Sequence, residues 1–362
     1  MKTSHLNKAI QVLFFFFLVF AGAYFTKPFL APLSIALLLA MLFLPLSQKI
    51  ENRGVSRGVA AFLCVFLLAI VIAGLLALLS TQIASLSEDL PKMKQSISNS
   101  VNQLKEYISN TMGVSKQQQQ QMLEQQKNAG GGQSGKVITT ILNSLSGLLV
   151  NTILVFVYIF LLLFFRNHLK NFILKLVPDE NKDKTNLIIS TSSTIATKYL
   201  SGLGTMIVIL WVMYGIGFSI VGVKSAVFFA ILCGLLEIVP FVGNVTGTSI
   251  TIIMAITQGG GSGMVLGIVI TYALVQFIQT YILEPLVVGS EVNINPLFTI
   301  IVIVVGEMVW GVAGMIVAIP MLGMIKVVCD NIDALKPYGF LIGSEKKESN
   351  SGLLNKIKGW FR

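Results

Sequence analysis

Charged residues are scarce in this sequence: they make up 12% of the 362 residues, whereas hydrophobic residues make up 54%. Average soluble domains carry roughly twice that share of charge. Several apolar runs reach the length of about twenty helical residues that crosses a bilayer core. The composition therefore excludes an ordinary soluble domain and predicts an all-α polytopic membrane protein.

Cysteine and histidine are also rare, with three and two copies. Each cysteine stands alone in an apolar stretch and both histidines lie outside the predicted spans, so no spacing indicates a disulfide framework or a metal site. The sequence also lacks the motifs of serine hydrolases, zinc proteases and Walker-type nucleotide binding. We therefore expect no enzyme activity, no cofactor, no metal and no nucleotide-driven pumping.

The net charge of +10 is concentrated beside the predicted spans, near the N-terminus and within 49–57, 166–198 and 326–362. This placement is the positive-inside pattern of membrane proteins rather than a nucleic-acid surface. We expect both termini in the cytoplasm, the lipid bilayer as a partner and no nucleic-acid partner.

The apolar runs divide the chain into six predicted parts. The first three spans occupy 1–80, an extracytoplasmic amphipathic helix with a Gln/Gly-rich tip occupies 81–136, and the fourth span occupies 137–165. A cytoplasmic or interfacial segment is expected at 166–200, a transport core with broken helices at 201–328 and a basic cytoplasmic tail at 329–362. The first run, Ala9–Phe25, is expected to remain as a span, although Ala21–Ala23 resembles a signal-peptide cleavage site.

The amphipathic helix at 81–136 continues a stripe of apolar residues, spaced three or four apart, from Leu79 to Met112. Such a stripe on a polar helix requires a partner. The partner is either the chain's own return segment or the same helix of another subunit, and the second alternative predicts an oligomeric collar outside the membrane.

The stretch Gly234–Asn244 interrupts an apolar run from Ala226 to Ile256 with Glu237, Pro240 and Gly243. Neither apolar arm is long enough to span a bilayer alone. The pattern predicts either a re-entrant helical hairpin, which we favour, or one broken crossing helix. Polar groups at a helix break inside the membrane are typical of transporter binding sites.

A second interrupted run, Ile300–Val328, contains Glu307, Trp310 and Gly314. Between the two interrupted runs, Val265–Leu283 is predicted to be a continuous span. Paired interrupted segments indicate a site at the membrane midplane. If both are hairpins, the turn from Glu284 to Pro296 is cytoplasmic; if each crosses once, the turn lies on the opposite side.

The core supplies eleven candidate substrate- or ion-binding residues: Glu237, Pro240, Gly243, Asn244, Gln276, Gln279, Glu284, Asn295, Glu307, Trp310 and Gly314. No lysine or arginine occurs between Lys224 and Lys326 to neutralise the two glutamates at the breaks. Desolvation then favours the protonated carboxyl group, which predicts proton or cation binding. The alternative is structural: a protonated glutamate bonded to backbone at each break, with the amide side chains joining helices.

Several motifs resemble the autoinducer-2 exporter-like family of bacterial permeases. The likeness rests on P-F-L-A-P-L at Pro28–Leu33, E-I-V-P-F-V-G at Glu237–Gly243, E-P-L-V-V-G at Glu284–Gly289, N-P-L at Asn295–Leu297 and W-G-V-A-G-M-I-V-A-I-P at Trp310–Pro320. The resemblance runs over nearly the whole chain. It implies about eight membrane segments, homo-oligomers, a location in the bacterial cytoplasmic (inner) membrane, and export of small polar signals in some members and sodium/proton antiport in others.

Three functions are consistent with the sequence. The leading hypothesis is a secondary transporter, an exporter of a small polar molecule such as an autoinducer-2-like signal, working by alternating access. The second is a sodium or lithium/proton antiporter that uses the same carboxylates. The third is a structural membrane protein organised by its external helix.

Overall fold

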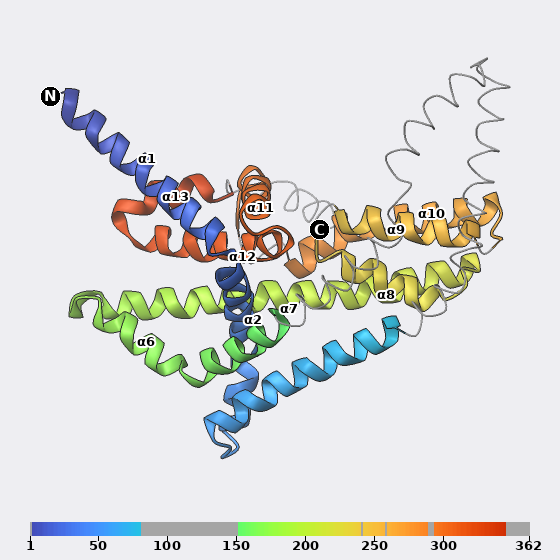
Figure 1. Ribbon diagram of the computed structural model, residues 1–362, viewed down its shortest axis with the longest axis horizontal. Helices are drawn as coiled ribbons and strands as arrows, with labels where there is room; N and C mark the ends of the chain where they lie inside the picture. Colours follow the sequence, from blue (N-terminus) through green and yellow to red (C-terminus); the bar gives the residue numbers. More distant parts are fainter. Residues whose placement is uncertain (1, 81–150, 240–241, 258, 289–292, 345–362) are drawn as a thin grey trace, which may run out of the picture. The chain divides into compact units, whose positions relative to one another are not determined.

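The computed structural model describes residues 2–80, 151–239, 242–257, 259–288 and 293–344. Within these ranges all named elements are helices, which confirms the predicted all-α class (Figure 1). The amphipathic helix predicted at 81–136, the start of the predicted fourth span, Pro240 and the tail from 345 onward lie outside the described residues.

Two compact units make up the chain, and each is described by itself. The first comprises Met1–Pro45, Leu162–Gly202 and Pro285–Arg362, and the second comprises Leu46–Leu161 and Leu203–Glu284. The unit boundaries fall inside helices, among them α2 (Lys27–Glu51) and α7 (Lys182–Val221). At these two points the chain therefore passes from one unit to the other within a helix.

Among the described helices, five are long and apolar enough to cross a membrane: Lys27–Glu51, Arg57–Ser80, Asp179–Val221, Ser262–Glu284 and Val312–Asn331. A sixth arises if Asn151–Phe164 and α6 (Arg166–Lys175), bent by 65° at their junction, form one span. Shorter apolar helices, including the end of α1 (Lys2–Phe25), accompany them. These helices confirm a multi-pass membrane protein; the total of eight segments stays a prediction.

The predicted surface segment at 166–200 and the span predicted after it are joined by one continuous helix. After α6 and the short 3-10 helix η1 (Asp179–Asn181), the single helix α7 runs for 40 residues from Lys182 to Val221. Pro178 precedes η1 and marks the last strong helix breaker before α7. Because no proline follows it up to Val221, the polar first turns continue directly into the apolar span.

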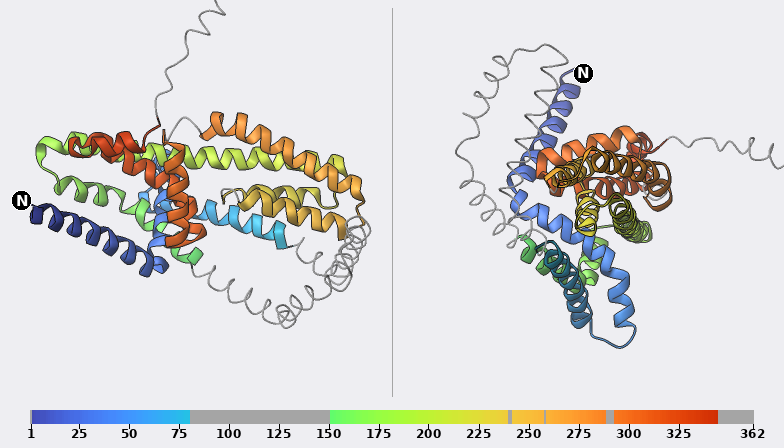
Figure 2. Two further views of the ribbon diagram at one scale, coloured as in Figure 1. Left: turned by 90° about the horizontal axis from the view of Figure 1, so that it is seen from above. Right: turned by 90° about the vertical axis from the view of Figure 1, so that its right-hand side faces the viewer.

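The first interrupted run forms two short helices, α8 (Ala226–Leu236) and α9 (Val242–Thr257), which pack against each other (Figure 2). A Cβ at Gly243 would clash with the backbone carbonyl group of Leu236. A Cβ at Gly247 would lie 2.9 Å from the sulfur of Cys233. Glycine is therefore required where α9 returns against α8, and the predicted break is confirmed.

The second interrupted run forms α11 (Pro296–Trp310) and α12 (Val312–Asn331), which also pack together. The chain turns at Gly311, whose φ of +66° lies in the left-handed region that favours glycine. A Cβ at Gly306 would lie 2.6 Å from the carbonyl oxygen of Gly314. Pro320 lies inside α12 without ending it.

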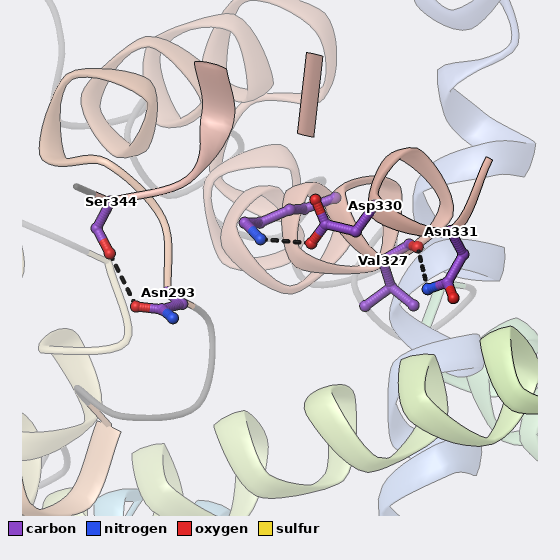
Figure 3. A network of polar contacts seen from close by, with 6 residues as sticks. Asn293, Val327, Asp330, Asn331 and Ser344 are labelled. Carbon is purple, nitrogen blue, oxygen red and sulfur yellow. Dashed lines mark hydrogen bonds and ion pairs between the residues drawn. The ribbon is translucent and has the colours of Figure 1, made fainter. Parts of the chain in front are cut away.

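The chain stays folded beyond the predicted core boundary at 328. After η3 (Asp333–Leu335), helix α13 (Lys336–Ile342) packs against α12. Ser344 donates a 2.8 Å hydrogen bond to the side chain of Asn293, whereas Lys326 pairs with Asp330 within α12 (Figure 3). The first part of the predicted tail thus contains a helix that packs against α12, and the part from 345 onward lies outside the described residues.

The predicted continuous span at Val265–Leu283 changes helix type along its length. It begins as the α-helix α10 (Ser262–Ile278) and continues as the π-helix η2 (Gln279–Val288). The π-helix is rare and often occurs at functional sites. Its first residue, Gln279, is also one of the residues predicted for binding.

The close contact between α11 and α12 predicts a stability difference between two glycine-to-alanine changes. Gly306→Ala places a methyl group against Gly314 and should lower the free energy of unfolding by about 1–3 kcal/mol. The matched control is Gly204→Ala in α7, where a Cβ meets nothing within 4 Å and stability should be kept or raised. Thermal unfolding in detergent measures both, and equal midpoints would contradict the described packing.

Candidate functional site

Glu237 lies at the break between α8 and α9, where it caps the C-terminus of α8. Its backbone N–H donates to the carbonyl oxygen of Cys233 at 3.1 Å, so the last turn of α8 fixes its position. The side chain turns into the second unit, and only 9% of the residue is exposed. A carboxyl group so removed from water requires a proton, a cation or hydrogen-bond donors.

Gln279 supplies one such donor from the first position of the π-helix. Its Nε2 donates a 2.7 Å hydrogen bond to Glu237 Oε1, and the glutamine is 1% exposed. Two further atoms of this pair, Glu237 Oε2 and Gln279 Oε1, are buried without a hydrogen-bond partner among the described residues. Both are oxygen acceptors when Glu237 is ionised, so neither can satisfy the other.

Two tyrosines lie close to the same carboxyl group. Tyr214 on α7 is fully buried and stacks on Phe218, and its hydroxyl group has no partner within the described part of the chain. Tyr214 and Tyr272 of α10 both lie within electrostatic reach of Glu237. The pair of Glu237 and Gln279 therefore lies among residues from four elements, α7, α8, α10 and η2.

Close helix contacts hold these elements together. A Cβ at Gly217 of α7 would clash with the side chain of Thr271 of α10, and one at Gly234 of α8 would clash with the ring of Trp211. The Trp211 indole N–H donates to the carbonyl oxygen of Ile231 at 3.1 Å. These contacts leave little freedom for α7, α8 and α10 around the carboxyl group.

Glu284 is the second carboxylate near Gln279. It lies exposed on η2, five residues after Gln279. It also lies close enough to Glu237 for its charge to act on that residue. Of the two carboxylates, Glu237 is the one that is hydrogen-bonded to the Gln279 amide.

No basic residue balances this negative charge in the described structure. The ion pairs found among the described residues are Arg57–Glu51, Lys182–Asp179, Lys326–Asp330 and Lys336–Asp333, and none includes Glu237 or Glu284. The same residues contain no cluster of three histidine, cysteine or acidic side chains that could hold a metal ion. The site thus offers oxygen atoms from carboxyl, amide and phenol groups.

Several of the predicted binding residues make structural contacts. Asn295 accepts a 2.9 Å hydrogen bond from the N–H of Leu297 as the N-cap of α11, and the Trp310 indole donates to the carbonyl oxygen of Ala23 at 3.0 Å. Gln276 of α10 donates to the hydroxyl group of Thr280, in the first turn of η2, at 3.1 Å. Gly243 and Gly314 permit the close helix contacts of the two hairpins.

The remaining predicted residues are placed less fully. Glu307 is exposed on α11 in the first unit, whereas Glu237 belongs to the second. Pro240 lies outside the described residues, and Asn244 belongs to α9. A binding role for all eleven predicted residues stays a prediction.

Tyr214 and Tyr272 were not among the residues predicted from the sequence. Both lie in apolar spans, where tyrosine is ordinary, and no break or charge marks them. The available signal was the presence of a phenol group in a segment flanked by small residues, since buried tyrosine hydroxyl groups usually find a partner. That signal is weak until the fold brings Tyr214 close to Glu237.

The site can hold one positive charge. A proton on Glu237 Oε2 would convert that atom into a donor facing an amide whose oxygen lacks a partner. Amide and carboxylic acid groups form a paired arrangement of two hydrogen bonds, in which each group donates once and accepts once. A hard cation bound between the same oxygen atoms would meet the same need.

The chain is similar in sequence to a known family and to several named proteins. The sequence profile described as AI-2E family transporter matches residues 13–334. YueF of Bacillus subtilis is 25% identical over 54% of this chain, and a protein of Borreliella burgdorferi is 24% identical over 61%. Both carry the name "putative transport protein".

Another Bacillus subtilis relative, YrrI, is 29% identical over 36% of this chain and bears the same kind of name. The three matches cover 36%, 53% and 62% of the relatives' own lengths, so the chain spans about half the length of the curated relatives it matches.

The unpaired hydroxyl group of Tyr214 predicts opposite effects on stability and on transport. Tyr214→Phe removes a buried polar group without a partner and should raise the free energy of unfolding by roughly 1 kcal/mol in the absence of substrate. If the hydroxyl group binds the transported ion, the same change should lower the transport rate. Thermal unfolding and proteoliposome transport test the two effects, and a destabilised variant with full transport would contradict this assignment.

Proposed function

Because this chain belongs to the AI-2E family of transporters, we propose that it is a secondary transporter in which Glu237 binds the coupling proton. The transported solute is a small polar molecule, such as an autoinducer-2-like signal, exported by alternating access. The family profile and the apolar helices support a multi-pass protein of the bacterial cytoplasmic membrane. The placement of lysine and arginine beside the spans supports both termini on the cytoplasmic side.

The observation that carries the proposal is the buried pair of Glu237 and Gln279. One hydrogen bond joins the two side chains, and one oxygen atom of each is left without a donor among the described residues. A single proton on the carboxyl group provides the missing donor. Loss of that proton leaves a buried, unpaired negative charge, which is strongly unfavourable away from water.

This difference in free energy between the protonated and the ionised carboxyl group links proton binding to the conformation of the protein. The protonated pair is stable in a dry site, whereas the ionised carboxylate is stable only when water or a cation reaches it. Proton release would therefore accompany exposure of Glu237 to one side of the membrane. Coupling of proton release to exposure is the requirement of a proton-driven transporter.

Sodium/proton antiport is the second candidate function, and one specific observation favours it. The buried atoms without partners at this site are all oxygen atoms: Glu237 Oε2, Gln279 Oε1 and the hydroxyl group of Tyr214. Hard cations prefer carboxylate, carbonyl and hydroxyl oxygen ligands. Sodium would then replace the proton at the same residues, with no separate organic solute.

A proteoliposome assay tests both functions. Purified protein is reconstituted in vesicles that contain a pH-sensitive dye, a pH gradient is imposed, and sodium or the candidate solute is added outside. We expect a dye response that Glu237→Gln abolishes, because glutamine cannot exchange a proton. A response to sodium alone identifies the antiporter, and a response that requires the solute identifies the exporter.

The matched control is Glu180→Gln, which makes the same chemical change on the exposed helix η1. It should keep the dye response of the unmodified protein. Full proton movement in Glu237→Gln, with the protein shown to be folded and inserted, would refute Glu237 as the coupling group. Absence of any response in the unmodified protein, with all tested cations and solutes, would refute proton coupling itself.

A further inference from the structure

Helix α6 carries an apolar face that the described part of the chain leaves uncovered. Apolar side chains at positions i, i+3, i+4 and i+7 of a helix lie on one side of it, and here they are Leu169, Phe172, Ile173 and Leu176. Leu176, the C-cap, keeps right-handed helical backbone angles and so continues the face. These side chains belong to residues that are between 41% and 68% exposed, and α6 has no buried residue. An apolar face of this kind requires a partner that removes it from water.

Basic side chains border this apolar face on both sides. Lys170 and Lys175 lie about 110° to either side of its centre, since an α-helix turns by about 100° per residue. Both lysines are exposed, and neither belongs to an ion pair within the described residues. α6 contains no acidic residue, and Asn167 and Asn171 occupy the side opposite the apolar face. This pattern is typical of a helix at a membrane surface, where cationic side chains reach the headgroups and apolar side chains enter the acyl region.

The path of the chain also places α6 at a membrane surface. α6 follows the apolar helix Asn151–Phe164 and is bent from it by 65°. If the preceding helix runs along the membrane normal, α6 lies closer to the membrane plane than to the normal. Ten helical residues measure about 15 Å, which is half of a bilayer core. Extension of α6 into that core would also bury its cationic side chains without an acidic partner, at a high cost in free energy.

The charge along α6 selects among the partners that could cover its apolar face. A second copy of α6 would place lysine next to lysine, and like charges repel. The C-terminal segment 345–362 also has an excess of basic residues. Anionic phospholipids carry the opposite charge in their headgroups, and their acyl chains accept apolar side chains. This one partner therefore matches both the charge and the apolar face of α6.

We propose that α6 is a binding site for anionic phospholipids. The helix lies in the headgroup region, with its apolar face in the acyl boundary and with Lys170 and Lys175 on lipid phosphate groups. The preceding membrane span ends at Phe164, so α6 is not its second half. By the positive-inside rule this surface is the cytoplasmic one. The site is separate from the proton chemistry of Glu237 and does not depend on it.

The charge of the site is tested by replacing both lysines. Full-length protein in vesicles is labelled with a phosphatidylglycerol that carries a photoactivatable group beside its phosphate, and mass spectrometry measures labelling of residues 166–176. An anionic surface contributes about 1 kcal/mol per lysine, or roughly fivefold in binding, so Lys170→Gln with Lys175→Gln should lower this labelling by about tenfold or more. Unlabelled phosphatidylglycerol should compete, and phosphatidylcholine should not.

The matched control is Lys182→Gln with Lys336→Gln, which removes the same charge from two lysines outside α6 that are each paired with an aspartate. This control should keep the labelling of residues 166–176. Equal labelling in the α6 variant and the control would overturn the proposal, as would equal competition by the two lipids.

The position of α6 is tested with a bimane label at Phe172→Cys, on the apolar face, and at Asn171→Cys, on the opposite side. The three native cysteines are buried, and the unmodified protein gives the background. A lipid quencher near the headgroups should quench the label at 172, and aqueous iodide the label at 171. Iodide quenching at 172 would place α6 in water, and quenching only by a lipid quencher at the chain end would place it in the bilayer core. Protection at 172 from all quenchers would show a protein partner, and each of these three results would overturn the proposal.

Discussion

The hydrogen bond between Gln279 and Glu237 is the interaction on which the second unit depends. It joins the π-helix η2 to the break after α8, two points 42 residues apart in the chain. Because the carboxyl group is buried, this bond limits the protonation states that the site can tolerate. Within the described structure an amide, rather than a lysine or arginine, is hydrogen-bonded to the carboxyl group.

Glycine contacts make this arrangement possible in both hairpins. Gly243 and Gly247 let α9 pack closely on α8, and Gly306 and Gly314 do the same for α11 and α12. Small residues at helix interfaces are the usual means of tight packing in membranes, where no hydrophobic force draws one helix to another. Both helix pairs therefore pack through close glycine contacts. Of the two breaks, only the one between α8 and α9 carries a buried carboxyl group in the described structure.

The interrupted helices could be predicted from the sequence because glycine, proline and glutamate inside apolar runs leave a strong local signal. Gly311 and the region after Leu236 are the actual break points. The partner of Glu237 could not be predicted, since a side-chain pair separated by 42 residues depends on how the helices pack. Tyr214 was missed for the same reason.

Other features depend on local backbone geometry that composition does not encode. The change from α10 to a π-helix at Gln279 has no signature in the apolar pattern, and the helix α13 lies in a segment whose basic residues resemble a tail. Conversely, Asn295 and Trp310 were predicted as binding residues because polar groups near a break are conspicuous. Their hydrogen bonds show that capping and helix contact also account for such groups.

Infrared spectroscopy of the purified protein tests the central claim most directly, because the C=O stretch of a protonated carboxyl group is separate from that of a carboxylate. The account predicts that a buried carboxyl band persists in the neutral range, disappears at alkaline pH and is absent in Glu237→Gln. A band that is unchanged in Glu237→Gln, or a Glu237 that stays ionised throughout the neutral range, would contradict proton binding at this residue.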